Sequence, residues 1–194
     1  HPHFATEEQK YKYSPYKRDP ETLARYWAIP GTEGYTHILG GLEKDGETGS
    51  ISTDPENHDL MDHLRWDKVA RIPVPDLKVL GDEADADLLI VGFGSTYGHL
   101  YSAMEELRRK GHKVALAQFK YVNPLPKNTP EVLARYKKVV VAEQNLGQLA
   151  ALLRIRINNF APYQYNQVKG QPFVVSELVS TFEKLLKAPL PKEE

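Results

Sequence analysis

The residues best placed to bind a ligand are Gly92-Phe93-Gly94-Ser95, which directly follow the predicted strand 87–91, DLLIV. A short, largely apolar run of this kind is typical of a parallel strand that is buried on both faces. A glycine-rich turn between such a strand and a helix presents backbone N–H groups that can bind a phosphate or another anion. We therefore predict that a helix begins at about Thr96 and that the rest of the fold is built around this corner.

Three interpretations of this turn remain open. A dinucleotide site would need the third glycine of a GxGxxG motif and an acidic residue about 20 positions later. The sequence has GFGSTY instead, and the next predicted strand ends in Gln118-Phe119-Lys120. We favour tight packing of the strand against the helix, with Ser95 or Thr96 as the helix N-cap. In the third interpretation Gly92, Gly94 and the two residues after it face a neighbouring domain or subunit.

A second group of polar residues, Glu143, Gln144 and Asn145, follows the apolar stretch 138–142. The carboxyl ends of parallel strands meet at one edge of a sheet, so we expect this group to share an edge with Ser95. A buried Glu143 could accept hydrogen bonds from backbone N–H groups of the adjacent turn, and contact with a partner chain is the alternative. Direct proton transfer is not expected, because no second titratable group lies nearby in the sequence.

Two histidines, His58 and His63, lie close to Asp59 and Asp62. Their spacing of five does not place both imidazoles on one helix face, as the i, i+4 spacing of HExxH zinc sites does. We therefore predict no metal site here and expect His58 to cap or bridge within its own segment. The chain has no cysteine, which excludes disulfides, thiolate zinc sites and iron–sulfur ligation by these residues.

The composition is that of an ordinary globular protein of 194 residues, with 41% hydrophobic and 26% charged side chains. A net charge of -1 gives no electrostatic reason to expect nucleic acid or an anionic membrane as a partner. No apolar run approaches the roughly 20 residues of a membrane helix, and no signal-peptide pattern is present. Because the chain begins with His1 rather than Met, we expect a piece of a longer polypeptide.

Residues 1–75 are predicted to form an extended, irregular arm, because apolar residues are sparse and prolines recur. Such a segment buries too little apolar surface to offset its ordering entropy, so its aromatic residues are expected to dock elsewhere. Leu60, Leu64 and Val69 are expected to lie partly on one face of its helix. The expected elements are a hairpin that pairs 36–39 with 49–52 across the turn 44–46, and a helix over 55–71 capped by Asp54.

Residues 76–188 alternate between apolar strands and amphipathic helices, and 189–194 are predicted to be a frayed tail. This alternation predicts an α/β fold, with an open, mostly parallel sheet and helices on both faces. We expect 163–168 to be an outer strand and Ser176 to cap the last helix. The expected strands are 86–92, 113–119, 138–142 and 163–168, and the expected helices are 97–110, 130–135, 147–157 and 174–186.

Several longer motifs occur together and in order. They are ARYWAIPGTEG at 24–34, DPENH at 54–58, VGFGSTYG at 91–98, FKYVNPLP at 119–126 and VVVAEQNLGQLAALLR at 139–154. In this combination the sequence resembles the alpha subunit of 2-oxoacid:ferredoxin oxidoreductases, and most of all the type that uses 2-oxoglutarate. The resemblance covers nearly the whole chain. It implies that 1–75 are the end of the thiamine pyrimidine-binding domain with a linker, and that 76–188 are a transketolase-C-terminal-like domain.

The resemblance implies a cytoplasmic, heteromeric thiamine-diphosphate enzyme of the TCA cycle. Such an enzyme converts a 2-oxoacid and coenzyme A oxidatively to an acyl-CoA, here succinyl-CoA, and passes the electrons to ferredoxin. A beta subunit would supply the diphosphate and Mg²⁺ site and the [4Fe-4S] cluster. This segment would bind no cofactor by itself and hold no catalytic residue, since it lacks cysteine and a Gly-Asp-Gly…Asn motif. Its role would be structure and subunit assembly.

The resemblance also implies that the arm runs beside the thiamine domain near the substrate cavity. Arg25 is therefore a candidate for the substrate side, because a guanidinium suits a carboxylate substrate, although interface packing is the favoured interpretation. Two other functions remain open: a free-standing nucleotide- or CoA-binding module, and the C-terminal domain of another thiamine enzyme such as a transketolase.

Overall fold

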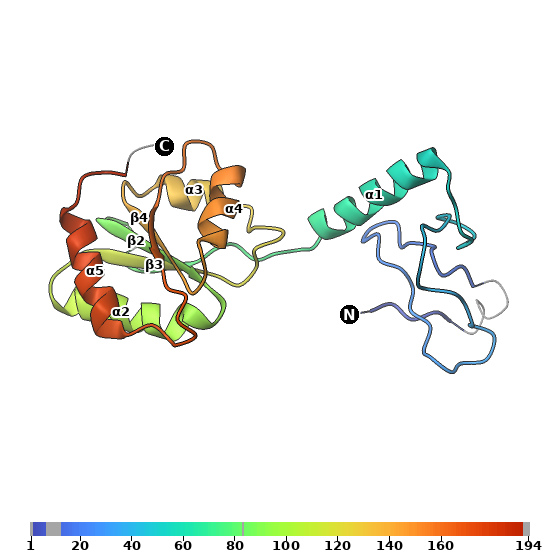
Figure 1. The fold of residues 1–194 in the computed structure, drawn as a ribbon, viewed down its shortest axis with the longest axis horizontal. Helices are drawn as coiled ribbons and strands as arrows, with labels where there is room; N and C mark the ends of the chain where they lie inside the picture. Colours follow the sequence, from blue (N-terminus) through green and yellow to red (C-terminus); the bar gives the residue numbers. More distant parts are fainter. Residues whose placement is uncertain (1, 7–12, 83, 192–194) are drawn as a thin grey trace. The chain divides into compact units, whose positions relative to one another are not determined.

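The computed structural model describes residues 2–6, 13–82 and 84–191. These residues form two compact units, His1–Pro73 and Val74–Glu194, each with its own internal contacts. Figure 1 shows the irregular backbone of the first unit and the layered helices and sheet of the second. The predicted order, an irregular segment followed by an α/β sheet, is confirmed.

The second unit is a five-stranded sheet in the order β1-β3-β2-β4-β5 (Figure 1). Four strands are parallel, and β1 pairs antiparallel with β3. Helices cover both faces, so the predicted fold class is confirmed. The strands are β1 (Val79–Gly81), β2 (Leu88–Phe93), β3 (Val114–Phe119), β4 (Val139–Glu143) and β5 (Tyr163–Asn166). The helices are η2 (Gly94–Thr96), α2 (Tyr97–Arg109), α3 (Thr129–Ala134), α4 (Gln148–Arg156) and α5 (Val175–Lys187).

The apolar run of β2 is explained by its position in the middle of the sheet. Leu88 and Ile90 pack into the layer that α2 and α5 cover, while Leu89 and Val91 pack into the layer of α3 and α4. All four side chains are fully buried. Burial of each such side chain contributes about 1.5–3 kcal/mol, which makes β2 the centre of the folded unit.

Two details of this unit differ from the sequence-based expectation. The short strand β1 has only three residues and gives too little alternation to be recognised. Ser176 does not cap α5, so that prediction was wrong. The N-cap position is Val174, which has extended backbone and no capping side chain, and Ser176 already lies inside the first turn. The edge position predicted for 163–168 is confirmed by β5, which pairs only with β4.

In its described residues the first unit contains one helix, α1 (Pro55–Ala70), which begins as predicted after Asp54. The Asp54 carboxylate accepts a hydrogen bond from the Glu56 N–H at 2.9 Å. The predicted apolar face is only partly correct, because Leu60 is exposed and Met61 is the buried residue of the helix. The described remainder of the unit has isolated bridges only, between Phe4 and Trp27, Arg18 and Arg25, and Lys44 and Ile51.

The predicted pairing of 36–39 with 49–52 was wrong. Ile51 bridges Lys44 instead, and the loop closes through a hydrogen bond from the Asp45 N–H to the Ser50 carbonyl at 2.8 Å. The Asp45 side chain accepts hydrogen bonds from the Glu47 and Thr48 N–H groups and so fixes a tight turn. A turn this short pairs its own flanks, and 36–39 have no strand partner among the residues that the structure describes.

Glu43 ties α1 to the turn before it. Its carboxylate contacts Nδ1 of His58 at 2.8 Å and accepts a hydrogen bond from Nη1 of Arg65 at 3.0 Å. Hydrogen bonds from Arg65 and then His58 lower the pKa of Glu43 to about 2, and the Glu43 contact raises the pKa of His58. The expectation that His58 bridges within its own segment is therefore confirmed.

This network makes the stability of the first unit depend on pH. The pKa of Glu43 is depressed from 4.5, so its contribution is complete above that value and is lost as the pH falls. The pKa of His58 is raised from 6.5, so its contribution is present below that value and is lost as the pH rises through the folded pKa. We expect the melting temperature to decline on both sides of about pH 5–6.

Glu43→Gln should flatten both arms of this profile, because the network loses the carboxylate that both partners contact. Glu47→Gln is the matched control, since Glu47 is exposed in the same segment and its side chain has no ion pair among the described residues. The check is a series of melting curves between about pH 2 and pH 8. Identical profiles for the two variants would contradict the assignment.

Candidate functional site

Three loops that follow neighbouring strands meet at one edge of the sheet. The register pairs Phe93 of β2 with Phe119 of β3, and Val91 of β2 with Val141 of β4. The carboxyl ends of β2, β3 and β4 therefore lie level with one another in the sheet. We call the three segments that follow them, 94–97, 120–123 and 144–147, the carboxyl edge. The predicted meeting of Ser95 with the residues after β4 at one edge is thus correct.

Gly92 lies inside β2, and its lack of a side chain lets α2 pack closely against the strand. A Cβ at this position would lie 2.2 Å from Cδ1 of Leu100 and 2.8 Å from Oε1 of Gln118. Gly94 begins the 3-10 turn η2 with φ of +60°, a conformation that glycine adopts easily. The favoured interpretation, tight packing of strand against helix, therefore explains Gly92, and the left-handed backbone explains Gly94, so neither glycine needs a nucleotide.

Thr96 occupies the N-cap position of α2, but neither Ser95 nor Thr96 makes a capping hydrogen bond through its side chain. The prediction of a side-chain cap was wrong because the preceding 3-10 turn already holds the Thr96 backbone in a helical conformation. The Thr96 hydroxyl instead donates to the Phe93 carbonyl at 2.9 Å. Gly92 and Thr96 are buried, whereas Gly94 and Ser95 are exposed.

Glu143, at the end of β4, is completely buried. Its two carboxylate oxygens accept hydrogen bonds from the Leu149 N–H at 2.7 Å and from the Ala150 N–H at 3.0 Å. These donors belong to the first turn of α4, where backbone N–H groups have no partner within the helix. A carboxylate there also interacts favourably with the helix dipole. Glu143 therefore fastens α4 to β4, as the first of its two interpretations predicted.

The next two residues are also engaged within the unit. Oδ1 of Asn145 accepts hydrogen bonds from the Gly147 N–H at 2.7 Å and the Gln148 N–H at 3.0 Å. Nε2 of Gln144 donates to the Gln171 carbonyl at 2.7 Å. Gln144 remains exposed and Asn145 is half-buried. The polar side chains of this loop thus shape it, and the residue that follows them, Leu146, is exposed.

The carboxyl edge carries exposed apolar side chains that the sequence analysis missed. Leu146 is 83% exposed, and Tyr97 and Tyr121 are 44% and 46% exposed. Each of the three belongs to a different loop of the edge. The available signal at Leu146 was an apolar residue between Asn145 and Gly147, the N-cap position of α4. Apolar side chains gathered at an exposed edge are typical of a contact surface.

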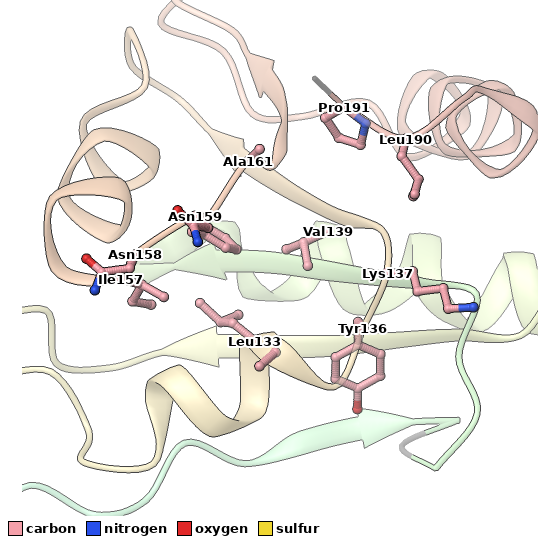
Figure 2. Close-up of a pocket in the computed structure, with 12 residues that line it drawn as sticks. Leu133, Tyr136, Lys137, Val139, Ile157, Asn158, Asn159, Ala161, Leu190 and Pro191 are labelled. Atoms are coloured by element: carbon pink, nitrogen blue, oxygen red, sulfur yellow. The ribbon is translucent and has the colours of Figure 1, made fainter. Parts of the chain in front are cut away.

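A cavity of about 320 Å³ lies at the other end of β4 (Figure 2). Figure 2 shows Leu133, Tyr136 and Val139 along its floor, with Leu190 and Pro191 on the opposite side. The walls are aliphatic, aromatic or amide groups, with Lys137 as the charged residue among the lining side chains. Such a lining offers no pair of acid and base groups, and the cavity is open to solvent.

Arg25, the substrate-side candidate, lies in the first unit and is half-buried. Its guanidinium carbon lies 4.8 Å from the centroid of the Tyr16 ring, a cation–π contact. His58 and His63 contact carboxylates in ion pairs. In the described part of the chain, no group of three or more His, Cys, Asp or Glu side chains could hold a metal ion. None of the described helices is long and apolar enough to cross a membrane.

Comparison with known proteins shows which family this chain resembles. Residues 86–177 match the core domain II of pyruvate:ferredoxin oxidoreductase. Over 166 residues the chain is 49% identical to the 2-oxoglutarate oxidoreductase subunit KorA of Mycobacterium tuberculosis, an alignment that covers 86% of this chain and 25% of that protein. The chain is homologous to the alpha subunits of 2-oxoacid:ferredoxin oxidoreductases. The resemblance predicted from the sequence motifs is therefore confirmed.

Two further relatives agree with this assignment. This chain is 32% identical over 157 residues to subunit alpha of 2-oxoacid:ferredoxin oxidoreductase 2 from Aeropyrum pernix. The alignment covers 78% of this chain and 24% of that protein. It also matches the 2-oxoglutarate:ferredoxin oxidoreductase of Magnetococcus marinus, solved with 2-oxoglutarate, coenzyme A and succinyl-CoA bound. That match has a TM-score of 0.80 and 32% identity, and covers 94% of this chain and 32% of that one. This chain thus spans about a quarter to a third of the length of these proteins.

Proposed function

We propose that this chain is part of the alpha subunit of a thiamine-diphosphate-dependent 2-oxoglutarate:ferredoxin oxidoreductase of the cytoplasm. The whole enzyme would convert 2-oxoglutarate and coenzyme A to succinyl-CoA and carbon dioxide, with two electrons passed to ferredoxin. The observation that carries this proposal is the match, over 94% of the chain, to an enzyme solved with 2-oxoglutarate, coenzyme A and succinyl-CoA. The identity of 49% to a 2-oxoglutarate oxidoreductase subunit supports the same substrate.

The residues of this chain do not fit an iron–sulfur cluster, and the buried carboxylate that ends β4 does not fit Mg²⁺. An iron–sulfur cluster requires thiolate ligands, and the chain has no cysteine. Both carboxylate oxygens of Glu143, at the end of β4, are occupied by backbone N–H groups of α4, so this carboxylate is not available for Mg²⁺. We infer that the thiamine diphosphate, Mg²⁺ and [4Fe-4S] sites lie on a beta subunit and on other parts of the alpha chain.

The role of this segment is then mainly structural, and its surface supports a function in assembly. The carboxyl edge presents Leu146, Tyr97 and Tyr121 beside the exposed Gly94, Ser95 and Gln144, which we infer face another domain or subunit. The first unit also exposes many large apolar side chains, which suits a segment that docks on the remainder of the enzyme. These side chains are Phe4, Trp27, Ile29, Ile38, Leu39, Leu42, Ile51, Leu60, Trp66 and Ile72.

Co-purification tests this proposal. The full alpha chain, tagged and isolated from its native source, is expected to bring down a partner subunit that contains an iron–sulfur cluster. Leu146→Asp places a charge in the carboxyl edge and should reduce recovery of the partner at least about 10-fold, the loss typical of a buried interface residue. The melting temperature of the alpha chain should not change, because Leu146 is 83% exposed.

The matched control is Ile155→Asp. Ile155 is 80% exposed in the last turn of α4, and it is not part of the carboxyl edge. We expect this variant to recover the partner as well as the wild type does. Full recovery with Leu146→Asp would refute the assembly role of the carboxyl edge, and an isolated alpha chain without any partner would refute the subunit assignment.

A further inference from the structure

Two arginines of the first unit are held side by side by a tight turn. Arg18 and Arg25 form an antiparallel bridge, which places their side chains on the same side of the ribbon. Between them the Asp19 carboxylate accepts hydrogen bonds from the Glu21 and Thr22 N–H groups at 3.1 and 2.8 Å. Leu23 closes the turn with φ of 57°, an unfavourable value for a leucine. The chain thus brings two like charges together although their repulsion opposes it.

Helix α1 adds a third cation, Lys68, to this pair. Nη1 of Arg71, at the end of α1, donates to the Pro20 and Glu21 carbonyls, both at 3.1 Å, so that this face of the helix lies against the turn. Lys68 lies three residues before Arg71 and therefore on the same face. Burial and then the positive charges of Arg18 and Arg25 lower the pKa of Lys68, which agrees with this placement.

Among the described residues, these cations have no negative partner. Nη1 of Arg18 donates to the Leu23 carbonyl at 2.9 Å, but its buried Nε has no hydrogen-bond partner among the described residues. The Arg25 guanidinium stacks on Tyr16, and within the described part of the chain neither it nor the Lys68 ammonium has a hydrogen bond or ion pair.

Arg65, one turn before Lys68, shows the contrasting arrangement. Its guanidinium is paired with the carboxylates of Glu43 and Asp62. The same helix face therefore carries one neutralised cation and one cation without a counter-charge. The three cations are Arg18, Arg25 and Lys68, and the buried Nε of Arg18 has no hydrogen-bond partner among the described residues. Such a group of cations is typical of a binding site for a negatively charged group.

We propose that Arg18, Arg25 and Lys68 bind a carboxylate or phosphate group of a small-molecule reactant. Guanidinium groups match the geometry of both oxyanions with paired N–H donors, and a lysine ammonium adds a point charge. The inference rests on the proposed function, which supplies two reactants with such groups. 2-Oxoglutarate has a carboxylate at the end away from its reacting carbonyl, and coenzyme A has phosphates. The attraction of either group to each of the three cations would offset the repulsion among them.

Steady-state kinetics of the assembled alpha–beta complex test this site. Arg25→Gln and Lys68→Gln each remove one cation, and both are expected to raise the KM of the same reactant by about 10- to 100-fold, as loss of a charge-assisted contact does. The reactant affected, 2-oxoglutarate or coenzyme A, identifies the source of the anion. Lys17→Gln is the matched control, because Lys17 is exposed beside Arg18 in the sequence, and both of its KM values should stay unchanged.

Melting temperatures without reactants separate binding from a structural role. Removal of one of three mutually repelling cations should leave the melting temperature unchanged or raise it. Unchanged KM values for both reactants would overturn the proposal, and so would a lower melting temperature with unchanged KM values, which would indicate a partner carboxylate as the counter-ion. If the wild-type complex does not oxidise 2-oxoglutarate, the proposed function fails. The site is then tested by whether 2-oxoglutarate, coenzyme A or inorganic phosphate raises the melting temperature of the wild type more than that of Lys68→Gln.

Discussion

Glu143→Ala is expected to destabilise the second unit by about 3–5 kcal/mol, the largest effect of a single substitution that we foresee. The change removes a completely buried carboxylate and leaves the N–H groups of Leu149 and Ala150 without acceptors. Each buried donor left unpaired costs about 1–3 kcal/mol, and the missing side-chain volume adds a cavity cost. Since these donors form the first turn of α4, we expect this helix to loosen first.

Urea unfolding followed by far-UV circular dichroism measures this effect. Glu143→Gln keeps one acceptor oxygen and should lie between the alanine variant and the wild type. Glu131→Gln is the control, because Glu131 is exposed and its ion pair with Arg135 is one turn apart on the surface of α3. It should change the free energy of unfolding by less than about 0.5 kcal/mol. A change below about 1 kcal/mol for Glu143→Ala would show that the buried hydrogen bonds are not needed.

Gly92→Ala is expected to destabilise the second unit by about 1–3 kcal/mol, because it overfills a packed contact. The new Cβ would lie 2.2 Å from Cδ1 of Leu100 and 2.9 Å from Oγ1 of Thr96. Leu100 is fully buried and cannot move away without disturbing the layer under α2. The substitution therefore forces α2 away from the central strand.

Gly98→Ala is the opposite case within the same helix. A Cβ at Gly98 would meet nothing within 4 Å, and the residue lies in α2 with ordinary helical backbone. Alanine favours a helix over glycine by about 1 kcal/mol, so this variant should be more stable than the wild type. The same unfolding experiment compares the two. Equal stability of the two variants would mean that the contact at Gly92 is not tight.

The central sheet could be predicted from the sequence because its strands are buried on both faces. The runs around Ile90, Leu116 and Val140 are apolar without interruption, and each precedes or follows a helix of regular period. The short strand β1 could not be predicted, since its three residues are defined by their pairing with β3 rather than by their own pattern.

The predicted site was correct where a local rule decides the contact. Glu143 ends a buried strand just before a helix, and a buried carboxylate at that point must find backbone donors. The predicted caps at Ser95 and Ser176 failed because helix starts depend on backbone conformation, which residue type alone does not fix. The hairpin prediction failed because the Asp45 turn pairs its own flanks.

The cation cluster could not be predicted at all. Arg18 and Arg25 come together through a turn that depends on the left-handed backbone of Leu23, and Lys68 joins them from a helix that begins at Pro55. Contacts between such distant positions depend on how the first unit folds as a whole. The family resemblance selected Arg25 from the sequence. The structure places Arg18 and Lys68 near it, and the proposed anion site rests on these three residues together.

The most direct test of the account is turnover by the reconstituted enzyme. The full alpha chain combined with its beta subunit is expected to reduce a low-potential dye or ferredoxin only when 2-oxoglutarate and coenzyme A are both present, and neither subunit alone should do so. Residues 1–194 combined with the same beta subunit should be inactive, because they hold no cofactor site of their own. Reduction by residues 1–194 alone, or no reduction of dye or ferredoxin by the complete pair with 2-oxoglutarate and coenzyme A, would contradict the account.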